Sequence, residues 1–113
     1  MGKLGINLKT KKIKIGILGG SFDPAHKGHL AISKEALKKF NLKKIIWAIT
    51  KKNPFKKQSD NDLKTRIEYC KKIIGKNKHI KVNFYEDRIN SNKTINLINY
   101  FVKDKKNEIY YLM

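Results

Sequence analysis

Two histidines, His26 and His29, are the residues of this sequence whose type and spacing are best suited to chemistry. They stand three positions apart with Gly28 between them, shortly after Pro24. At the beginning of a helix this spacing places the two imidazoles about one turn apart, facing the same space. A helix amino terminus attracts anions, and a glycine removes a side chain that would block them. The pattern therefore favours a phosphate-containing ligand over an ordinary strand-to-helix turn.

The loop before the histidines supports the same interpretation. Gly19 and Gly20 end an alternating apolar stretch over 13–18, and glycines at such a turn let backbone N–H groups approach a phosphate. We expect the N–H groups around Gly20, Ser21 and Phe22 to hold a triphosphate, with packing as a second role for Phe22. The alternative is that the histidines only cap the helix or lie on the surface. A metal site is not predicted, because no carboxylate or cysteine stands at ligand spacing from the pair.

Apolar periodicity predicts the elements that must position this loop. Strands are predicted over 13–18, 45–49, 80–84 and 108–113, and helices over 27–40, 59–74 and 92–102. Ser59 is expected to start the second helix, with Asp62 completing an imperfect capping box, and Gly75 to end it. The order indicates an α/β, Rossmann-like doubly wound parallel sheet, β-α-β-α-β-α-β, with ligands beyond the carboxyl ends of its strands. Because the last strand ends with the chain, we expect the fold to be incomplete at its C-terminus.

The composition indicates one folded domain behind a basic leader. The 113 residues carry 27 Lys and Arg against 9 Asp and Glu, a formal charge of +18, and 40% are hydrophobic, which is enough for a core. Residues 1–12 lack periodicity and are predicted to be a disordered leader, with the domain over 13–113. The single cysteine, the absence of a membrane-length apolar run and the absence of a secretory signal predict a cytoplasmic protein with no membrane partner.

The positive charge alone is weak evidence for nucleic acid. Of the basic residues 25 are lysines, and Lys, Ile and Asn make up 52 of the 113 positions. These amino acids have A/T-rich codons, so a skewed genome could supply the basicity. A sequence-specific reader would use arginine at base edges and gather its charge on one element. We therefore predict no specific nucleic-acid partner, although the field will attract anions such as nucleotides.

The run Gly-Gly-Ser-Phe-Asp-Pro-x-His-x-Gly-His over 19–29 resembles the signature of the HxGH nucleotidyltransferases, which have a Rossmann-like fold. Within that superfamily, residues 13–113 look like the N-terminal part of a nucleotidyltransferase domain of the bacterial nicotinate-nucleotide adenylyltransferases. Trp47, the segment 53–56 (Asn-Pro-Phe-Lys), the helix bearing Arg66, and Thr94 also match that family. The pantetheine-phosphate adenylyltransferases share the opening but typically have threonine at the place of His26, and they are the alternative.

The resemblance implies attack by the 5′-phosphate of nicotinate mononucleotide on the α-phosphate of ATP. The products are deamido-NAD and pyrophosphate, formed in NAD biosynthesis with Mg²⁺ assistance and without a covalent enzyme intermediate. His26 and His29 are the implied catalytic residues, as donors to phosphate oxygens, which suits a reaction that needs positioning and charge neutralisation. The implied ATP and phosphate contacts are Gly19, Gly20, Ser21, Phe22 and Gly28, and the implied mononucleotide contacts are Asn53, Lys56 and Thr94.

The three mononucleotide positions each have a structural interpretation as well. Lys56 is one lysine among 25, and the two interpretations are equally good. Asn53 could serve only a turn. Thr94 could instead be a helix N-cap.

Three further residues are interpreted mainly as structural. Trp47 lies in an apolar strand pattern and is expected in the core. Arg66 could bind phosphate or pair with Asp62, and the structural role is favoured. Cys70 belongs to the apolar stripe of its helix and is predicted to be buried and inert.

The chain departs from the family pattern in two ways. Lys93 and Asn96 stand where the family usually has a tyrosine and an aspartate around the substrate-loop threonine. Beyond the fourth strand, family members continue into a Gly-x-Asp segment and a Ser-Thr-x-x-Arg-like segment that bind ATP, and this sequence holds neither. An inactive, shortened remnant that binds at most a nucleotide or phosphate is therefore the alternative to an active adenylyltransferase.

Overall fold

The chain folds around a parallel sheet. The computed structural model describes residues 12–51, 62–91 and 93–112. Its strands are β1 (Ile13–Gly20), β2 (Lys44–Ile49), β3 (Ile80–Asn83) and β4 (Asn107–Leu112), and its helices are α2 (Lys27–Lys39), α3 (Leu63–Ile74), α4 (Glu86–Ile89) and α5 (Thr94–Val102). Within these residues the sheet has four strands, all parallel, in the order β3-β2-β1-β4. The predicted α/β parallel sheet is confirmed.

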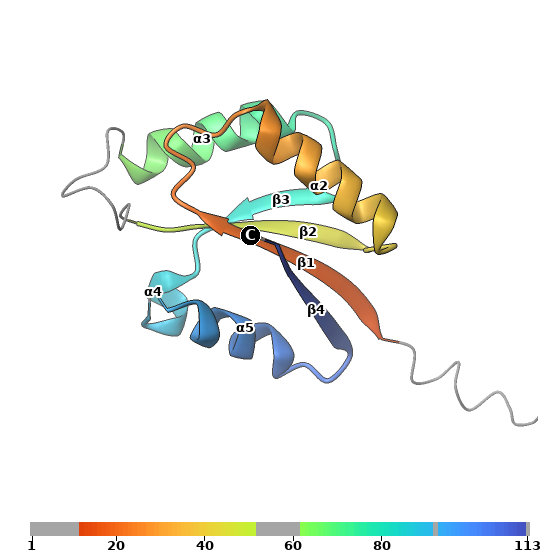
Figure 1. The fold of residues 1–113 in the computed structure, drawn as a ribbon. Coiled ribbons are helices and arrows are strands. Elements are labelled where there is room, and N and C mark those ends of the chain that lie inside the picture. Colours follow the sequence, from red (N-terminus) through yellow and green to blue (C-terminus); the bar gives the residue numbers. More distant parts are fainter. Residues whose placement is uncertain (1–11, 52–61, 92, 113) are drawn as a thin grey trace, which may run out of the picture.

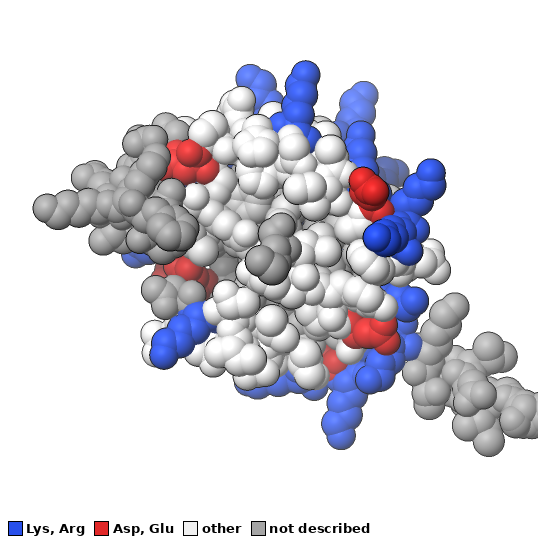
Figure 2. Space-filling model, in the orientation of Figure 1, with Lys and Arg blue, Asp and Glu red and all other residues white. Residues whose placement is uncertain are grey.

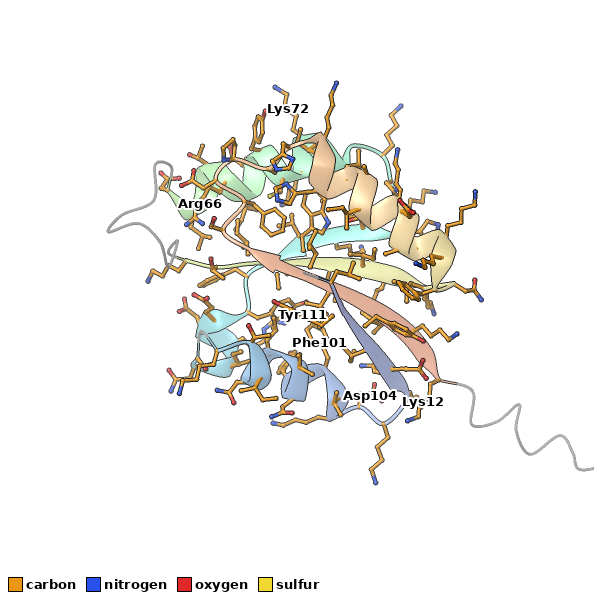
Figure 3. The ribbon with its side chains drawn as sticks, in the orientation of Figure 1. Lys12, Arg66, Lys72, Phe101, Asp104 and Tyr111 are labelled. Atoms are coloured by element: carbon orange, nitrogen blue, oxygen red, sulfur yellow. The ribbon has the colours of Figure 1, made fainter. Side chains whose placement is uncertain are left out.

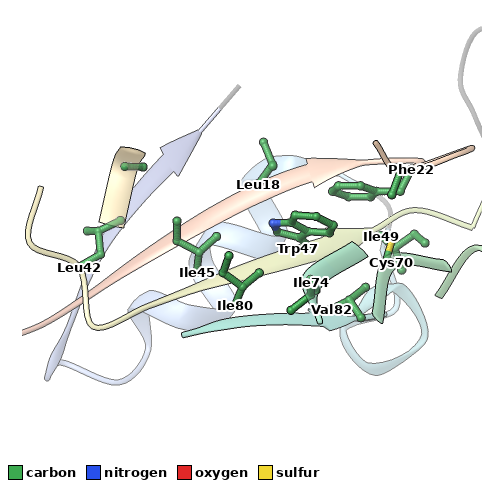
Figure 4. Packing of buried hydrophobic residues seen from close by; sticks show 12 residues of the cluster. Leu18, Phe22, Leu42, Ile45, Trp47, Ile49, Cys70, Ile74, Ile80 and Val82 are labelled. Atoms are coloured by element: carbon green, nitrogen blue, oxygen red, sulfur yellow. The ribbon is translucent and has the colours of Figure 1, made fainter. Parts of the chain in front are cut away.

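Helices cover both faces of the sheet. Figure 1 shows α2 and α3 on one face and α4 and α5 on the other, which is the doubly wound arrangement. Successive side chains of a strand point to opposite faces. Leu18 and Trp47 accordingly join the core under α2 and α3 (Figure 4), while Ile17 and Ile46 join Tyr85 in a second core on the other face. Burial on both faces explains why the central strands are almost continuously apolar.

The structure corrects two predicted boundaries. α3 begins at Leu63 with Asp62 as its N-cap, whose carboxylate accepts from the Thr65 backbone N–H at 2.7 Å. The predicted capping box, with Ser59 as N-cap, is therefore wrong, and Ser59 itself lies outside the described residues. The third strand ends at Asn83 because the chain turns into the short helix α4. Gly75 ends α3 with a φ of 61°, in agreement with the prediction.

β1 begins at Ile13, where order was expected. The backbone N–H of Ile13 donates to Lys106 O at 2.6 Å. Of the predicted leader over 1–12, the structure describes only Lys12.

Figure 2 shows the lysines and arginines of the face in view distributed around its rim, not gathered over one element. No described helix has the length and apolar character that a membrane crossing requires.

Candidate active site

The loop between β1 and α2 lies at the carboxyl end of the sheet, where a ligand is expected. β1 ends at Gly20, and His26 immediately precedes α2. The backbone N–H of Thr50, just after β2, donates to Gly20 O at 2.9 Å. This hydrogen bond joins the carboxyl ends of the two central strands. The predicted phosphate loop and the first residues after β2 are therefore neighbours.

The two histidines cap the amino terminus of α2 reciprocally. The Gly28 N–H donates to Nδ1 of His26, and the His26 N–H donates to Nδ1 of His29, each at 3.0 Å. The ring centroids lie 4.0 Å apart. This is a capping box, in which the N-cap side chain and the third helical side chain each satisfy a backbone donor. The histidines therefore do cap the helix, but capping uses only one nitrogen of each ring.

Capping also fixes which nitrogen of each ring carries the proton. A neutral imidazole has one donor and one acceptor nitrogen. Because Nδ1 of both His26 and His29 accepts from a backbone N–H, the proton of each neutral ring is on Nε2. The helix amino terminus thus carries two Nε2–H donors about one turn apart, an arrangement that can bind the oxygens of a polyphosphate.

Buried side chains hold His29 in place. Its ring lies 4.7 Å from that of Phe22 and 5.8 Å from that of Trp47, and Phe22 stacks on Trp47 at 5.0 Å. Trp47 Nε1 donates to Ser33 Oγ, which in turn donates to the His29 carbonyl oxygen, each at 2.8 Å. None of Phe22, Ser33 and Trp47 is more than 3% exposed. The predicted core role of Trp47 and packing role of Phe22 are confirmed.

Burial lowers the pKa of His29 below its ordinary value of 6.5, the neighbouring His26 lowers it further, and a hydrogen bond to the His26 backbone opposes both. The unfolded chain therefore takes up a proton on His29 at a higher pH than the folded chain does. The stability that neutral His29 contributes is present above pH 6.5 and is lost as the pH falls through the lower folded pKa.

When the pH is lowered from about 8 to about 5, we expect the thermal midpoint of the wild-type protein to fall by more than that of the His29→Gln variant. Glutamine at the third position of a capping box still accepts from the His26 N–H, but it does not titrate. Thermal unfolding followed by circular dichroism across this range makes the comparison. Parallel pH profiles for the two proteins would contradict a depressed pKa at His29.

Gly28 is required by the His26 ring. A Cβ at Gly28 would lie 2.8 Å from both Cε1 and Nδ1 of that ring, which is closer than such atoms approach. The glycine was expected to leave space for a phosphate. The structure shows that it also leaves space for the His26 ring. A larger residue would turn the imidazole away and break its bond to the helix.

We expect Gly28→Ala to weaken ATP binding strongly while changing stability little. Loss of the N-cap bond costs about 1 kcal/mol, and the better helix propensity of alanine returns up to about 1 kcal/mol. Isothermal titration with ATP and thermal unfolding measure the two effects. Lys27→Ala, on the same turn, is the control that leaves the capping box intact. ATP affinity in Gly28→Ala equal to that of the control would show that the orientation of His26 does not matter.

The remaining predicted phosphate contacts are placed at the same loop. Phe22 adopts a φ of 49°, a backbone conformation that side chains rarely adopt. A Cβ at Gly20 would make only ordinary contact with Phe22, at 3.6 Å, whereas one at Gly19 would lie 2.9 Å from the Tyr111 hydroxyl. Gly19 therefore makes room for a side chain of β4. Phosphate contacts at Gly19, Gly20 and Ser21 stay predictions.

The family model described as cytidylyltransferase-like matches residues 17–110. The chain belongs to the cytidylyltransferase-like family. Among the relatives of this cytidylyltransferase-like chain are two bacterial proteins, each described as a probable nicotinate-nucleotide adenylyltransferase. The protein of Pelagibacter ubique (strain HTCC1062) is 69% identical over 107 residues, covering 95% of this chain and 59% of its own length. That of Aliarcobacter butzleri (strain RM4018) is 40% identical over 106 residues, covering 89% and 57%.

The fold of the cytidylyltransferase-like chain also matches a solved structure. Plasmodium falciparum nicotinic acid mononucleotide adenylyltransferase, complexed with NaAD, superposes with a TM-score of 0.71 at 19% identity, over 88% of this chain and 50% of that protein. At this identity the match concerns the fold alone. The chain spans about 59% of the length of its Pelagibacter relative.

Thr94 is placed at the same end of the sheet, but not as a cap. It is the first residue of α5, and Lys93 is the N-cap, so the capping interpretation of Thr94 is wrong. Thr94 and Lys93 line a small hollow of about 30 Å³ together with Thr50, which follows β2. The other two predicted mononucleotide residues, Asn53 and Lys56, lie outside the described residues.

Neither a metal centre nor a reactive thiol is found in the described part of the cytidylyltransferase-like chain. No three His, Cys, Asp or Glu side chains of residues 12–51, 62–91 and 93–112 are grouped closely enough to hold an ion. Cys70 is fully buried, and burial raises the pKa of its thiol to about 11. The thiol is therefore protonated at neutral pH, and the inert role predicted for Cys70 is confirmed.

Sequence reasoning missed two residues that shape the site. Ser33 lies on the helical stripe of α2, and nothing in that pattern indicates its hydrogen bond with Trp47. Glu86 Oε1 accepts from the Lys51 N–H at 3.1 Å and so ties α4 to the chain after β2. Because α4 has no apolar periodicity, no sequence signal singles Glu86 out.

Proposed function

We propose that this chain carries the phosphate-binding, histidine-bearing part of a nicotinate-nucleotide adenylyltransferase. The 5′-phosphate oxygen of nicotinate mononucleotide attacks the α-phosphorus of ATP. The bond from that phosphorus to the bridging oxygen of the β-phosphate breaks, and the electron pair leaves with pyrophosphate. Deamido-NAD is the other product, and no side chain of the protein needs to form a covalent bond.

One observation carries this proposal: the reciprocal capping of α2, which leaves the Nε2–H of His26 and of His29 to donate. Negative charge grows on the leaving oxygens during nucleotidyl transfer, and fixed donors stabilise that charge without reorganising. Two donors on a helix amino terminus suit the triphosphate of ATP. The printed name of the Pelagibacter protein, 69% identical, supports nicotinate mononucleotide as the acceptor.

We place the mononucleotide at the carboxyl end of β2. Thr94 lines the hollow there together with Thr50, which directly follows β2. The hydrogen bond from the Thr50 N–H to Gly20 O brings the carboxyl end of β2 next to the predicted phosphate loop. An acceptor phosphate on the β2 side and ATP on the β1 side can therefore meet between the two strands.

Mg²⁺ enters this proposal as part of the substrate. The described residues offer no group of three metal-ligating side chains. Mg²⁺ keeps several waters and is commonly held by substrate phosphates with few protein ligands, so MgATP suits such a site. The ion neutralises phosphate charge, while His26 and His29 orient the phosphate oxygens.

The test is product formation by the full gene product with MgATP and nicotinate mononucleotide. We expect pyrophosphate and deamido-NAD in equal amounts, the latter identified by mass spectrometry. A protein that releases pyrophosphate only at the blank rate would be an inactive remnant, and the proposal would be wrong. Parallel reactions with nicotinamide mononucleotide and with 4′-phosphopantetheine identify the acceptor. Preference for 4′-phosphopantetheine would instead assign the chain to the pantetheine-phosphate adenylyltransferases.

A further inference from the structure

Arg66 is a buried cation at the base of the site. It lies in the first turn of α3 and is 2% exposed. A buried charge is costly unless it is well hydrogen-bonded, so a guanidinium in this place needs specific acceptors. Figure 3 shows Arg66 at the end of the sheet where β1 stops. Its burial leaves no surface on which a phosphate could bind.

The guanidinium of Arg66 donates to backbone carbonyl groups of two segments. Nη1 donates to Ser21 O at 2.9 Å and to Thr50 O at 2.7 Å, and Nη2 donates to Lys51 O. Ser21 belongs to the predicted phosphate loop, and Thr50 and Lys51 follow β2. A planar fork with five donors can hold three carbonyl groups at once, which a lysine ammonium on a flexible stem cannot match.

These bonds determine the direction of the neighbouring N–H groups. In a trans peptide the C=O of one residue and the N–H of the next point in opposite directions. The Thr50–Lys51 peptide illustrates this, since Thr50 O faces Arg66 while the Lys51 N–H donates to Glu86 at 3.1 Å. By the same geometry, Ser21 O faces Arg66 and the Phe22 N–H points away from it.

We propose that Arg66 is a positioning residue of the adenylyl-transfer site, an inference that rests on the proposed function. Its guanidinium orients the Ser21–Phe22 peptide so that the Phe22 N–H donates to a phosphate of ATP. It also holds the chain after β2 at a fixed distance from this loop. Arg66 itself touches neither substrate, and it couples the ATP side of the site to the mononucleotide side.

The first test compares Arg66→Lys with Ile74→Ala in the full gene product. Ile74 lies on the same helix, is buried, and packs in the core under α2 and α3, so the control is destabilised without touching either segment. We expect kcat/KM for MgATP to fall roughly a hundredfold in Arg66→Lys, as for a misplaced reacting group. In Ile74→Ala, assayed well below its thermal midpoint, kcat/KM should stay near the wild-type value. Equal kcat/KM values in the two variants would overturn the proposal.

The second test needs no activity and no variant. Amide signals of the wild-type protein are followed by NMR while ATP is added. The Phe22 N–H should shift on binding, and the Thr50 N–H, which donates to Gly20 O, should exchange slowly with and without ATP. If the Phe22 N–H signal does not shift when ATP binds, the proposal is overturned, even if Arg66→Lys does not fold. Wild-type protein that binds ATP with these signatures yet makes no dinucleotide would instead refute the proposed function.

Discussion

Replacement of His29 by alanine is expected to slow adenylyl transfer by about 10²–10³-fold, equivalent to about 2.7–4 kcal/mol of barrier, as for loss of one preorganised oxyanion donor. The reason lies in the geometry of the ring. Its Nδ1 is occupied by the His26 N–H, so its Nε2–H is the group left to face phosphate. Initial rates of deamido-NAD formation at saturating MgATP and nicotinate mononucleotide measure the effect.

Ile32→Ala is the matched control for His29→Ala. Ile32 lies on α2 and is 48% exposed, so its truncation changes the same helix away from the loop. We expect this variant to retain the wild-type rate. A tenfold effect or less in His29→Ala would argue against a donor role, and a comparable loss in the control would assign the effect to the helix as a whole.

Replacement of Trp47 by alanine is expected to lower the free energy of unfolding by about 3–5 kcal/mol, the usual cost of truncating a buried aromatic residue. Trp47 is fully buried and stacks on Phe22 with ring centroids 5.0 Å apart. The same change removes the donor to Ser33 Oγ and the ring that lies behind His29. Chemical denaturation of the two proteins gives the difference.

Two further variants separate the contributions of Trp47. Trp47→Phe keeps an aromatic ring and loses the Nε1–H, for which about 1 kcal/mol is expected from the hydrogen bond. Tyr69→Ala truncates an aromatic side chain on α3 that is 43% exposed, and it should change stability by no more than about 0.5 kcal/mol. If Trp47→Ala changed stability as little as Tyr69→Ala does, the central packing of this residue would be refuted.

The strands and three of the four described helices could be predicted because their apolar patterns are strong. The alternation over 13–18 and the apolar run over 45–49 report burial on one or both faces of a parallel sheet. The stripes of α2 and α3 each indicate a buried face, whereas α5 has no fully buried residue and leaves Ile95 and Val102 exposed. α4, with Ile89 as its single apolar residue, offers no stripe, so neither this helix nor the role of Glu86 could be read from the sequence.

The candidate site was predictable in its location but not in its internal geometry. The histidine spacing and the preceding glycines place a phosphate loop at the start of α2. That each imidazole accepts a backbone N–H, and that Gly28 must leave room for the His26 ring, depends on side-chain rotamers that spacing does not specify. Arg66 illustrates the same limit, because its acceptors are carbonyl groups of segments 45 and 16 residues away in the chain.

The most direct test of the central claim, that capping leaves two Nε2–H donors for ATP phosphates, is ¹⁵N NMR of the histidine rings. We expect the Nδ1 signals of the neutral His26 and His29 rings to be those of unprotonated acceptors and the Nε2 signals to be those of protonated donors. Addition of MgATP should shift both Nε2–H signals. Protonated Nδ1 atoms in either ring, or Nε2–H signals that do not respond to bound MgATP, would contradict the account.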